Sequence, residues 1–218
     1  MPSELDPPVS IQLAKIALDL GAIKISPENP FTWASGARMP IYNDNRLLLG
    51  DSSHRQLVAE GFQAIIDSRK IPTDVIAGTA TAGIPHATTL ANRLQCPLIY
   101  VRPTPKEHGM KNQIEGPLDP GKNVVVVEDL ISTGGSVLKV VHALREAGVR
   151  VQHCMGIFSY GFPDTIERFN EKDCQLHTLI QFEELLDFMK SSGKLSSEQL
   201  QTLMEWKDHP FEWWEKKK

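Results

Sequence analysis

The chain has 218 residues, of which 41% are hydrophobic and 23% charged, and its formal net charge is −4. These values fit one globular domain with a full core, and they exclude a broad nucleic-acid surface, which needs an excess of basic residues. No apolar stretch approaches membrane length, and the first residues lack the basic and apolar regions of a signal peptide. Cys96, Cys154 and Cys174 have no metal-ligand spacing. We therefore expect a cytoplasmic protein with reduced thiols and with neither nucleic-acid nor membrane partners.

Residues 1–50 predict a helix followed by a loop-rich segment. Ser10 is a candidate N-cap for a helix that ends near Gly21, and its apolar positions are Ile11, Leu13, Ile16, Ala17 and Leu20. Residues 26–50 contain too many turn formers for an extended helix. A pair of short, aromatic-rich strands near the surface is the structural expectation for residues 29–46.

Between residues 51 and 160, apolar strands alternate with amphipathic helices. We expect helices that begin at 51, 84 and 135, and strands at 74–78, 97–101, 123–128 and 149–158. This alternation predicts an α/β fold, in which a parallel sheet has helices on both faces and a ligand site at the carboxyl ends of its strands. Residues 161–218 are expected to complete the single domain with a short helix, a strand at 175–180 and two more helices.

The segment 123–136 carries the clearest chemistry. Four valines predict a buried strand, two acids follow as Glu128 and Asp129, and a helix opens at the run Ser132, Thr133, Gly134, Gly135 and Ser136. Backbone N–H groups at a helix N-terminus bind anions, and glycine lets the backbone approach a ligand closely. A capped helix after a core strand is the alternative. Two carboxylates at a buried strand end, however, need a partner such as a sugar diol or a metal.

Two other connections are candidates for binding. Residues 78–85 form a second strand-to-helix turn rich in small side chains, although glycine is also common in such turns for geometric reasons alone. Residues 102–116 form a long polar connection that contains Arg102, Lys106, His108 and Lys111. A loop of this length inside a compact domain is usually functional, and a solvated surface loop is the alternative.

Segment 123–136 resembles the phosphoribosyl pyrophosphate (PRPP) motif of the type I phosphoribosyltransferases. In that family the two acids hold the ribose hydroxyls, the loop after them holds the 5′-phosphate, and the counterpart of residues 78–85 meets the diphosphate and often contains a cis peptide bond. The resemblance implies PRPP contacts at Glu128, Asp129, Leu130, Ile131, Ser132, Thr133, Gly134, Gly135, Ser136, Thr79, Ala80, Thr81, Arg102, Lys106 and His108.

Two segments are similar to the orotate-using members of the family. Residues 102–116 resemble their mobile lid, which implies catalytic roles for Arg102, Lys106 and His108 together with Asp129. Residues 29–46 resemble their N-terminal hood, which implies orotate contacts at Ser35, Gly36, Tyr42, Arg46 and Ser132.

Four cations of better-known members are absent from this chain. Lysine is replaced at Ala34, Pro103 and near Ala82, and arginine is replaced at Tyr160. Arg46, Arg38 and the backbone of Ser35 and Gly36 are our candidates to bind the orotate carboxylate instead.

The resemblance implies transfer of the phosphoribosyl group from PRPP to orotate in pyrimidine (UMP) biosynthesis. It also implies Mg²⁺ held mainly by PRPP and near Asp129, and a homodimer whose lid covers the neighbouring site. Two alternatives stay open, a purine or uracil phosphoribosyltransferase and a regulator that senses PRPP without turnover. Trp206, Trp213 and Trp214 are interpreted as packing or interface aromatics, not as a base-stacking site.

Overall fold

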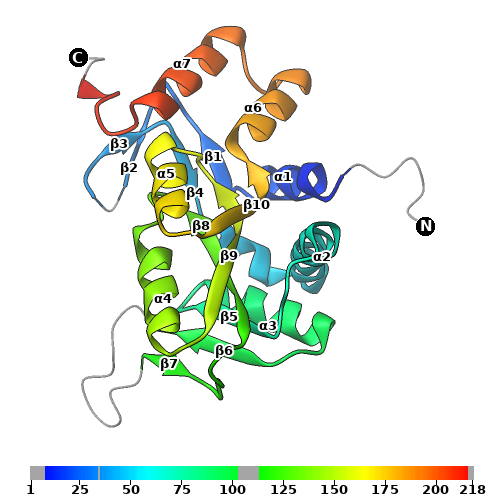
Figure 1. Cartoon of the computed structure of the whole chain (residues 1–218). Helices are drawn as coiled ribbons and strands as arrows, with labels where there is room; N and C mark the ends of the chain where they lie inside the picture. Colours follow the sequence, from blue (N-terminus) through cyan, green and yellow to red (C-terminus); the bar gives the residue numbers. More distant parts are fainter. Residues whose placement is uncertain (1–7, 34, 103–112, 216–218) are drawn as a thin grey trace.

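A six-stranded sheet lies at the centre of the molecule (Figure 1). The computed structural model describes residues 8–33, 35–102 and 113–215. The strand order is β10-β9-β8-β5-β6-β7, and every neighbouring pair is parallel except β6 with β7. The strands are β5 (Val75–Thr79), β6 (Leu98–Val101), β7 (Ile114–Glu115), β8 (Asn123–Ile131), β9 (Arg150–Ser159) and β10 (Gln175–Gln181). The predicted α/β sheet is confirmed.

Helices cover both faces of this sheet, as expected. Val125 and Val127 of β8 pack in one buried cluster with α1 (Val9–Asp19), α2 (Ser52–Arg69) and α3 (Gly83–Leu94). Val124 and Val126 pack in the other with α4 (Gly135–Glu146) and α5 (Pro163–Glu171). Two buried faces explain why the strand is a continuous run of valines, since an exposed face would favour polar residues at alternate positions.

A smaller layer, which we call the hood, lies above the sheet in Figure 1. It consists of β1 (Ile23–Ile25) paired with β4 (Ile41–Asn43), β2 (Phe31–Thr32) paired with β3 (Arg38–Met39), and the 3₁₀ helix η1 (Asn45–Gly50). The short strand pairs agree with the expected structure of residues 29–46. The hood is thus a set of small antiparallel pairs beside the parallel sheet.

The C-terminal helices pack against the hood. After β10 come α6 (Phe182–Ser191) and α7 (Ser197–Asp208), and α7 lies beside β2 and β3 in Figure 1. The buried Trp206 indole of α7 donates a hydrogen bond to the sulfur of Met39 at 3.1 Å. The C-terminal helices therefore support the hood as well as the sheet.

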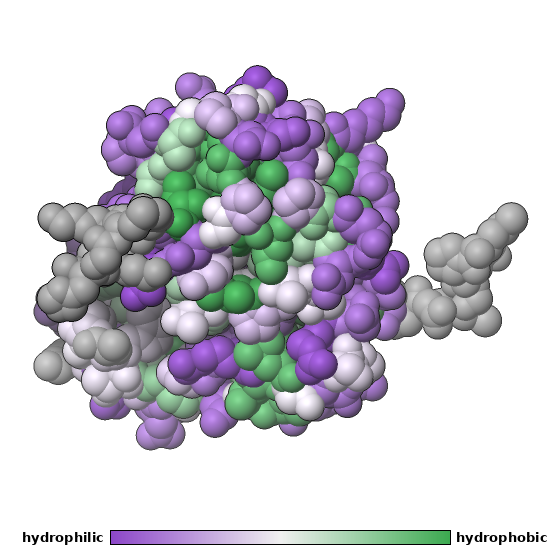
Figure 2. All heavy atoms as spheres, turned by 90° about the horizontal axis from the view of Figure 1, so that it is seen from below, coloured by the Kyte–Doolittle hydropathy of each residue, from purple (hydrophilic) through white to green (hydrophobic). Residues whose placement is uncertain are grey.

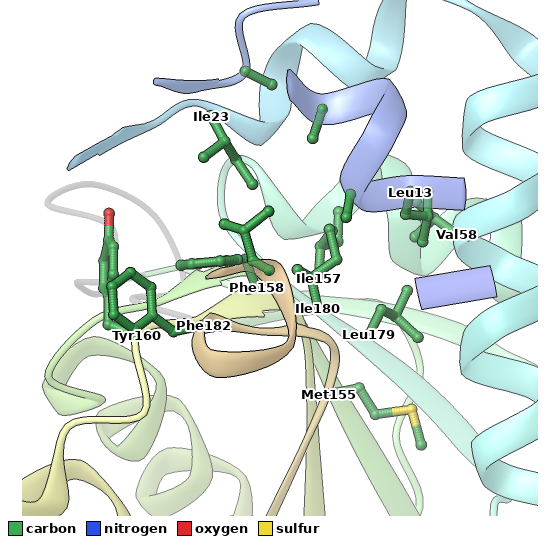
Figure 3. Close-up of a cluster of buried hydrophobic side chains, with 14 of the residues drawn as sticks. Leu13, Ile23, Val58, Met155, Ile157, Phe158, Tyr160, Leu179, Ile180 and Phe182 are labelled. Carbon is green, nitrogen blue, oxygen red and sulfur yellow. The ribbon is translucent and has the colours of Figure 1, made fainter. Parts of the chain in front are cut away.

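One hydrophobic cluster joins the hood to the sheet. Figure 3 shows Leu13 and Ile23 from the N-terminal region above Ile157, Phe158 and Ile180 from the sheet. These side chains are almost completely buried. Removing apolar area from water is favourable in proportion to the area buried. The shared core therefore holds the hood against the sheet.

Two sequence predictions of local structure were wrong. Ser10 does not cap α1, which begins at Val9 with Pro8 at the N-cap position and no side-chain cap. Proline suits this place because its fixed φ and missing N–H cost little at a helix start. In addition, β8 runs to Ile131 instead of ending at Glu128, because Leu130 and Ile131 pair with Phe158 and Ser159 of β9.

Within the described parts of the chain, we find no helix with the length and apolar character needed to cross a membrane.

Candidate active site

Two adjacent carboxyl groups, Glu128 and Asp129, lie near the end of β8, and we call them the acid pair. The backbone N–H of Asp129 donates to Oε1 of Glu128 at 3.0 Å. Burial raises the pKa of the Glu128 carboxyl to about 8, Asp129 acts in the same direction, and a hydrogen bond from Thr79 opposes both. Glu128 therefore keeps its proton at neutral pH in the ligand-free protein.

The β8–α4 loop, residues 132–136, follows the acid pair and opens α4. Gly134 has φ +75° and accepts a hydrogen bond from the N–H of Leu138 at 3.0 Å. A Cβ added at Gly134 would lie 2.8 Å from the ring of Phe169, so glycine is required here for both conformation and space. At Gly135 the nearest neighbour of such a Cβ among the described residues would be Thr133 Oγ1 at 4.0 Å, so none of them fills that side.

The β5–α3 loop, residues 80–82, packs against the acid pair. A Cβ at Gly83 would lie 2.4 Å from the carbonyl oxygen of Val127 and 3.3 Å from Cα of Glu128. Thr79, just before the loop, donates to the same Val127 carbonyl at 3.2 Å. Because β5 and β8 are parallel neighbours, the strand-to-helix loops that follow them begin at the same edge of the sheet, beside the acid pair. The peptide bond between Ala80 and Thr81 is cis, a feature that the sequence left open.

Arg102 lies beside the β5–α3 loop, at the start of the predicted lid. The N–H of Ala80 donates to the carbonyl of Val101 at 2.9 Å, which fixes the end of β6 next to the loop. The N–H of Arg102 donates to the carbonyl of Gln113 at 2.9 Å, and the Gln113 amide donates to the Arg102 carbonyl at 3.0 Å. Both ends of the predicted lid are therefore anchored, while Lys106 and His108 lie outside the described residues.

The start of η1 connects the hood to the acid pair. The Asn45 side-chain amide, which is fully buried, donates to the backbone carbonyl of Asp129 at 2.7 Å. Its neighbour Arg46 is exposed and pairs with Asp44, with 2.6 Å between Nε and Oδ1. This hydrogen bond raises the pKa of Arg46, and the charge of Asp129 contributes in the same direction. The contact of Arg46 with orotate stays a prediction.

Ser132 lies in the β8–α4 loop, and the other predicted orotate residues are on the outer part of the hood. Ser35 and Gly36 form the exposed turn between β2 and β3, where Gly36 has φ +84° and its N–H donates to the carbonyl of Trp33 at 2.8 Å. Tyr42 is partly exposed in β4, and its ring centroid is 5.9 Å from that of Phe31. The contacts of the described residues bring neither Ser35 nor Gly36 to the acid pair.

Tyr160, which replaces the family arginine, is part of the hood core. It is 1% exposed, and its ring centroid is 5.2 Å from that of Trp33 and 5.6 Å from that of Trp206. Figure 3 shows its hydroxyl oxygen pointing away from the aliphatic cluster. Arg38 lies with its guanidinium 5.4 Å from the ring centroid of Trp214, a cation–π contact. The tail tryptophans therefore pack on the hood, as interpreted from the sequence.

Sequence reasoning missed two residues beside the acid pair. The sequence pointed to Arg46 and not to its neighbour Asn45, because a sequence does not show that an amide side chain is buried. His86, near the start of α3, is buried, and burial lowers its pKa to about 4 against the opposing effect of Asp129. It is therefore neutral at physiological pH, and neither of its ring nitrogens has a hydrogen-bond partner among the described residues.

A parallel sheet that brings an acid pair and two strand-to-helix loops to one edge is the arrangement expected of a phosphoribosyltransferase domain. Residues 52–168 match the family model described as "Phosphoribosyl transferase domain". A relative named orotate phosphoribosyltransferase from Listeria monocytogenes is 46% identical over 93% of this chain and 97% of its own length. The corresponding protein of Staphylococcus saprophyticus is 45% identical over 90% and 97%.

A solved structure gives the same answer. The crystal structure of orotate phosphoribosyltransferase from Aeropyrum pernix is 31% identical, with a TM-score of 0.72, and the match covers 84% of this chain and 99% of that one. The chain belongs to the orotate phosphoribosyltransferase family. The resemblance and the fold inferred from the sequence are thereby confirmed.

Proposed function

We propose that this protein transfers the 5-phosphoribosyl group from PRPP to orotate, giving orotidine 5′-monophosphate and diphosphate, in the synthesis of UMP. The observation that carries the proposal is the convergence of the β8–α4 loop, the β5–α3 loop and the acid pair beneath a hood tied to them by Asn45. This arrangement offers one place each for a phosphate, a diphosphate, a ribose diol and a base. The family relationship supports orotate as the base.

The chemistry follows from the charges in the site. With the 5′-phosphate on residues 132–136 and the ribose hydroxyls on the acid pair, C1 of the ribose faces the hood. The bond from C1 to the diphosphate breaks, its electron pair leaves with the diphosphate, and positive charge develops on the ribose ring. Asp129, and Glu128 once it has lost its proton, stabilise that charge, while Arg102 and the N–H groups of the β5–α3 loop stabilise the departing anion. A ring nitrogen of orotate then forms the new bond to C1 with its electron pair, and the proton that this nitrogen carried passes to the departing diphosphate or to water.

Mg²⁺ fits this site as an ion shared with the substrate. Among the described residues, no group of three or more His, Cys, Asp or Glu side chains is placed to hold a metal. Mg²⁺ usually binds one or two carboxylates and completes its shell with water and substrate phosphates. Asp129 and Glu128 would supply those carboxylates, and the bound ion would neutralise charge on the diphosphate.

We further propose a homodimer in which Lys106 and His108 act on the neighbouring site. On the face turned away from α7, hydrophobic side chains gather toward the middle and hydrophilic ones surround them (Figure 2), an arrangement that a second copy would cover. Mixing Lys106→Ala with Asp129→Asn should restore part of the activity, because hybrid dimers would contain one intact site. An absence of rescue after confirmed subunit exchange would contradict this assembly.

A cytoplasmic location is proposed from the cysteines. All three are free thiols, and the sulfurs of the buried Cys154 and Cys174 are 3.4 Å apart without being bonded. Reducing compartments keep such thiols unpaired.

The experiment that tests the main proposal supplies PRPP and Mg²⁺ with orotate, uracil, adenine and hypoxanthine in turn, and follows the loss of each free base. We expect turnover of orotate. Turnover of another base with orotate untouched would support a purine or uracil enzyme instead. Binding of PRPP without turnover of any base would support a sensor.

A further inference from the structure

Helix α5 packs against the β8–α4 loop. Three of its side chains, one helical turn apart, contact the loop: Thr165, Arg168 and Phe169. Residues at i, i+3 and i+4 share one face of a helix, so this face of α5 is the surface on which the loop rests.

The shortest of these contacts is a hydrogen bond. The hydroxyl of Thr165 donates to the backbone carbonyl of Ser132 at 2.8 Å, and Thr165 is 1% exposed. Arg168 Nη1 reaches the carbonyl of Thr133 only at 3.5 Å, from an exposed position. The methyl group of Thr165 lies 3.4 Å from the place a Cβ would take on Gly134. Thr165 therefore contacts the loop through both branches of its side chain.

The direction of this hydrogen bond matters for anion binding. When successive N–H groups of a loop face a ligand, the carbonyl oxygens of the same peptides face away from it. A carbonyl that faces a buried region needs a donor, and leaving it without one costs about 1–3 kcal/mol. The Thr165 hydroxyl meets that need at Ser132, where the loop leaves β8.

We propose that Thr165 is a positioning residue for the 5′-phosphate of the substrate. By holding the Ser132 carbonyl toward α5, it keeps the N–H groups of residues 132–136 directed at the phosphate. Thr165 acts through the loop and not by contact with the substrate. The inference rests on the proposed function, because the phosphate it serves is that of PRPP or of the nucleotide product.

The test compares Thr165→Val with Thr165→Ser in the full-length protein. Valine keeps the shape of threonine and its methyl contact but has no donor, whereas serine keeps the donor and loses the methyl group. Titration calorimetry measures binding of two probes, ribose 5-phosphate and diphosphate with Mg²⁺. The first needs the β8–α4 loop, and the second, bound at the β5–α3 loop, serves as the internal control.

We expect T165V to bind ribose 5-phosphate about tenfold more weakly, the scale of one lost hydrogen bond, with diphosphate binding unchanged. T165S should bind both probes within about twofold of the wild type. Equal affinity of T165V and the wild type for ribose 5-phosphate would overturn the proposal. Equal weakening of both probes would also overturn it, since that result indicates a general structural effect. If T165V does not fold, Thr165→Ala gives the same comparison between probes.

A failure of the Thr165 proposal can be distinguished from a failure of the proposed function. A wild-type protein that binds ribose 5-phosphate but fails to convert orotate would contradict the proposed reaction, and the comparison of Thr165 variants could still be made. If the wild-type protein converts orotate and the T165V variant is indistinguishable from it, the proposed function stands and only the positioning role of Thr165 is contradicted.

Discussion

The two substrate-facing regions of this molecule are built in opposite ways. The acid pair and the β8–α4 loop come from one short stretch of chain, and the loop is shaped by backbone hydrogen bonds and by glycine. The hood is assembled from both ends of the chain and is held by aromatic packing, with Trp33, Tyr160 and Trp206 in mutual contact. The residues proposed to contact phosphate and ribose are therefore adjacent in sequence, although α5 supports their loop, whereas the platform proposed for the base depends on distant segments.

This difference implies that the two functions can be perturbed separately. A change in the acid pair should alter the use of PRPP, and a change in the hood core should alter the use of orotate. Asn45, which joins the two regions through the Asp129 carbonyl, should affect both.

The largest effect is expected from Asp129→Asn. Loss of one preorganised charge at the reacting centre typically slows turnover by about 10²–10³. Because the Asp129 backbone still accepts from Asn45, the hood should keep its place and orotate binding should change little. Initial-rate kinetics with each substrate varied would measure this. Asp19→Asn, in an exposed ion pair with Lys194, is the matched control and should leave the rate unchanged. Equal effects of Asp129→Asn on the use of PRPP and on the binding of orotate would show that the acid is structural.

Trp206→Ala should affect the hood most strongly. The side chain is fully buried against Met39, Tyr160 and Phe182, and truncation of a buried aromatic costs about 3–5 kcal/mol of unfolding free energy. We expect a lower melting temperature and a KM for orotate that rises more than the KM for PRPP. Trp206→Phe, which keeps an aromatic ring, should be milder. A rise confined to the KM for PRPP would contradict the assignment of orotate binding to the hood.

Asn45→Ala tests the connection itself. It removes the buried donor to the Asp129 carbonyl, a loss worth roughly 1–1.5 kcal/mol and about tenfold in affinity. Because the bond joins hood and acid pair, both KM values should rise. Asn92→Ala, on the exposed side of α3, controls for loss of an amide. If only one KM changes, Asn45 belongs to one region and does not couple them.

A dependence of stability on pH is expected at the acid pair. The pKa of Glu128 is raised from 4.5 to about 8, mainly by burial, so the folded protein holds this proton more tightly than the unfolded chain does. The resulting stabilisation is fully present below pH 4.5 and is lost as the pH rises through about 8. Denaturant unfolding measures the free energy of unfolding of the wild type and of Glu128→Gln from pH 5 to pH 8.5. We expect the value for the variant to exceed the value for the wild type by an amount that grows as the pH rises. Parallel curves would contradict a protonated Glu128.

The same contrast explains which parts the sequence could predict. Four valines, two acids and a glycine run mark β8 and its loop because every determinant is adjacent, although the strand proved longer than expected. The hood could be placed by resemblance alone. Nothing near Tyr160 in the sequence indicates that it packs between Trp33 and Trp206, and nothing near Thr165 indicates that it bonds a carbonyl 33 residues earlier. Such contacts depend on tertiary packing, which periodicity does not report.

The most direct test is a crystal structure with orotidine 5′-monophosphate, which carries both halves of the reaction in one molecule. We predict its 5′-phosphate on residues 132–136, its ribose hydroxyls on Glu128 and Asp129, and its base beneath the hood near Arg46. A phosphate bound away from the β8–α4 loop, or a base that makes no contact with the hood, would contradict the division of roles between the two regions.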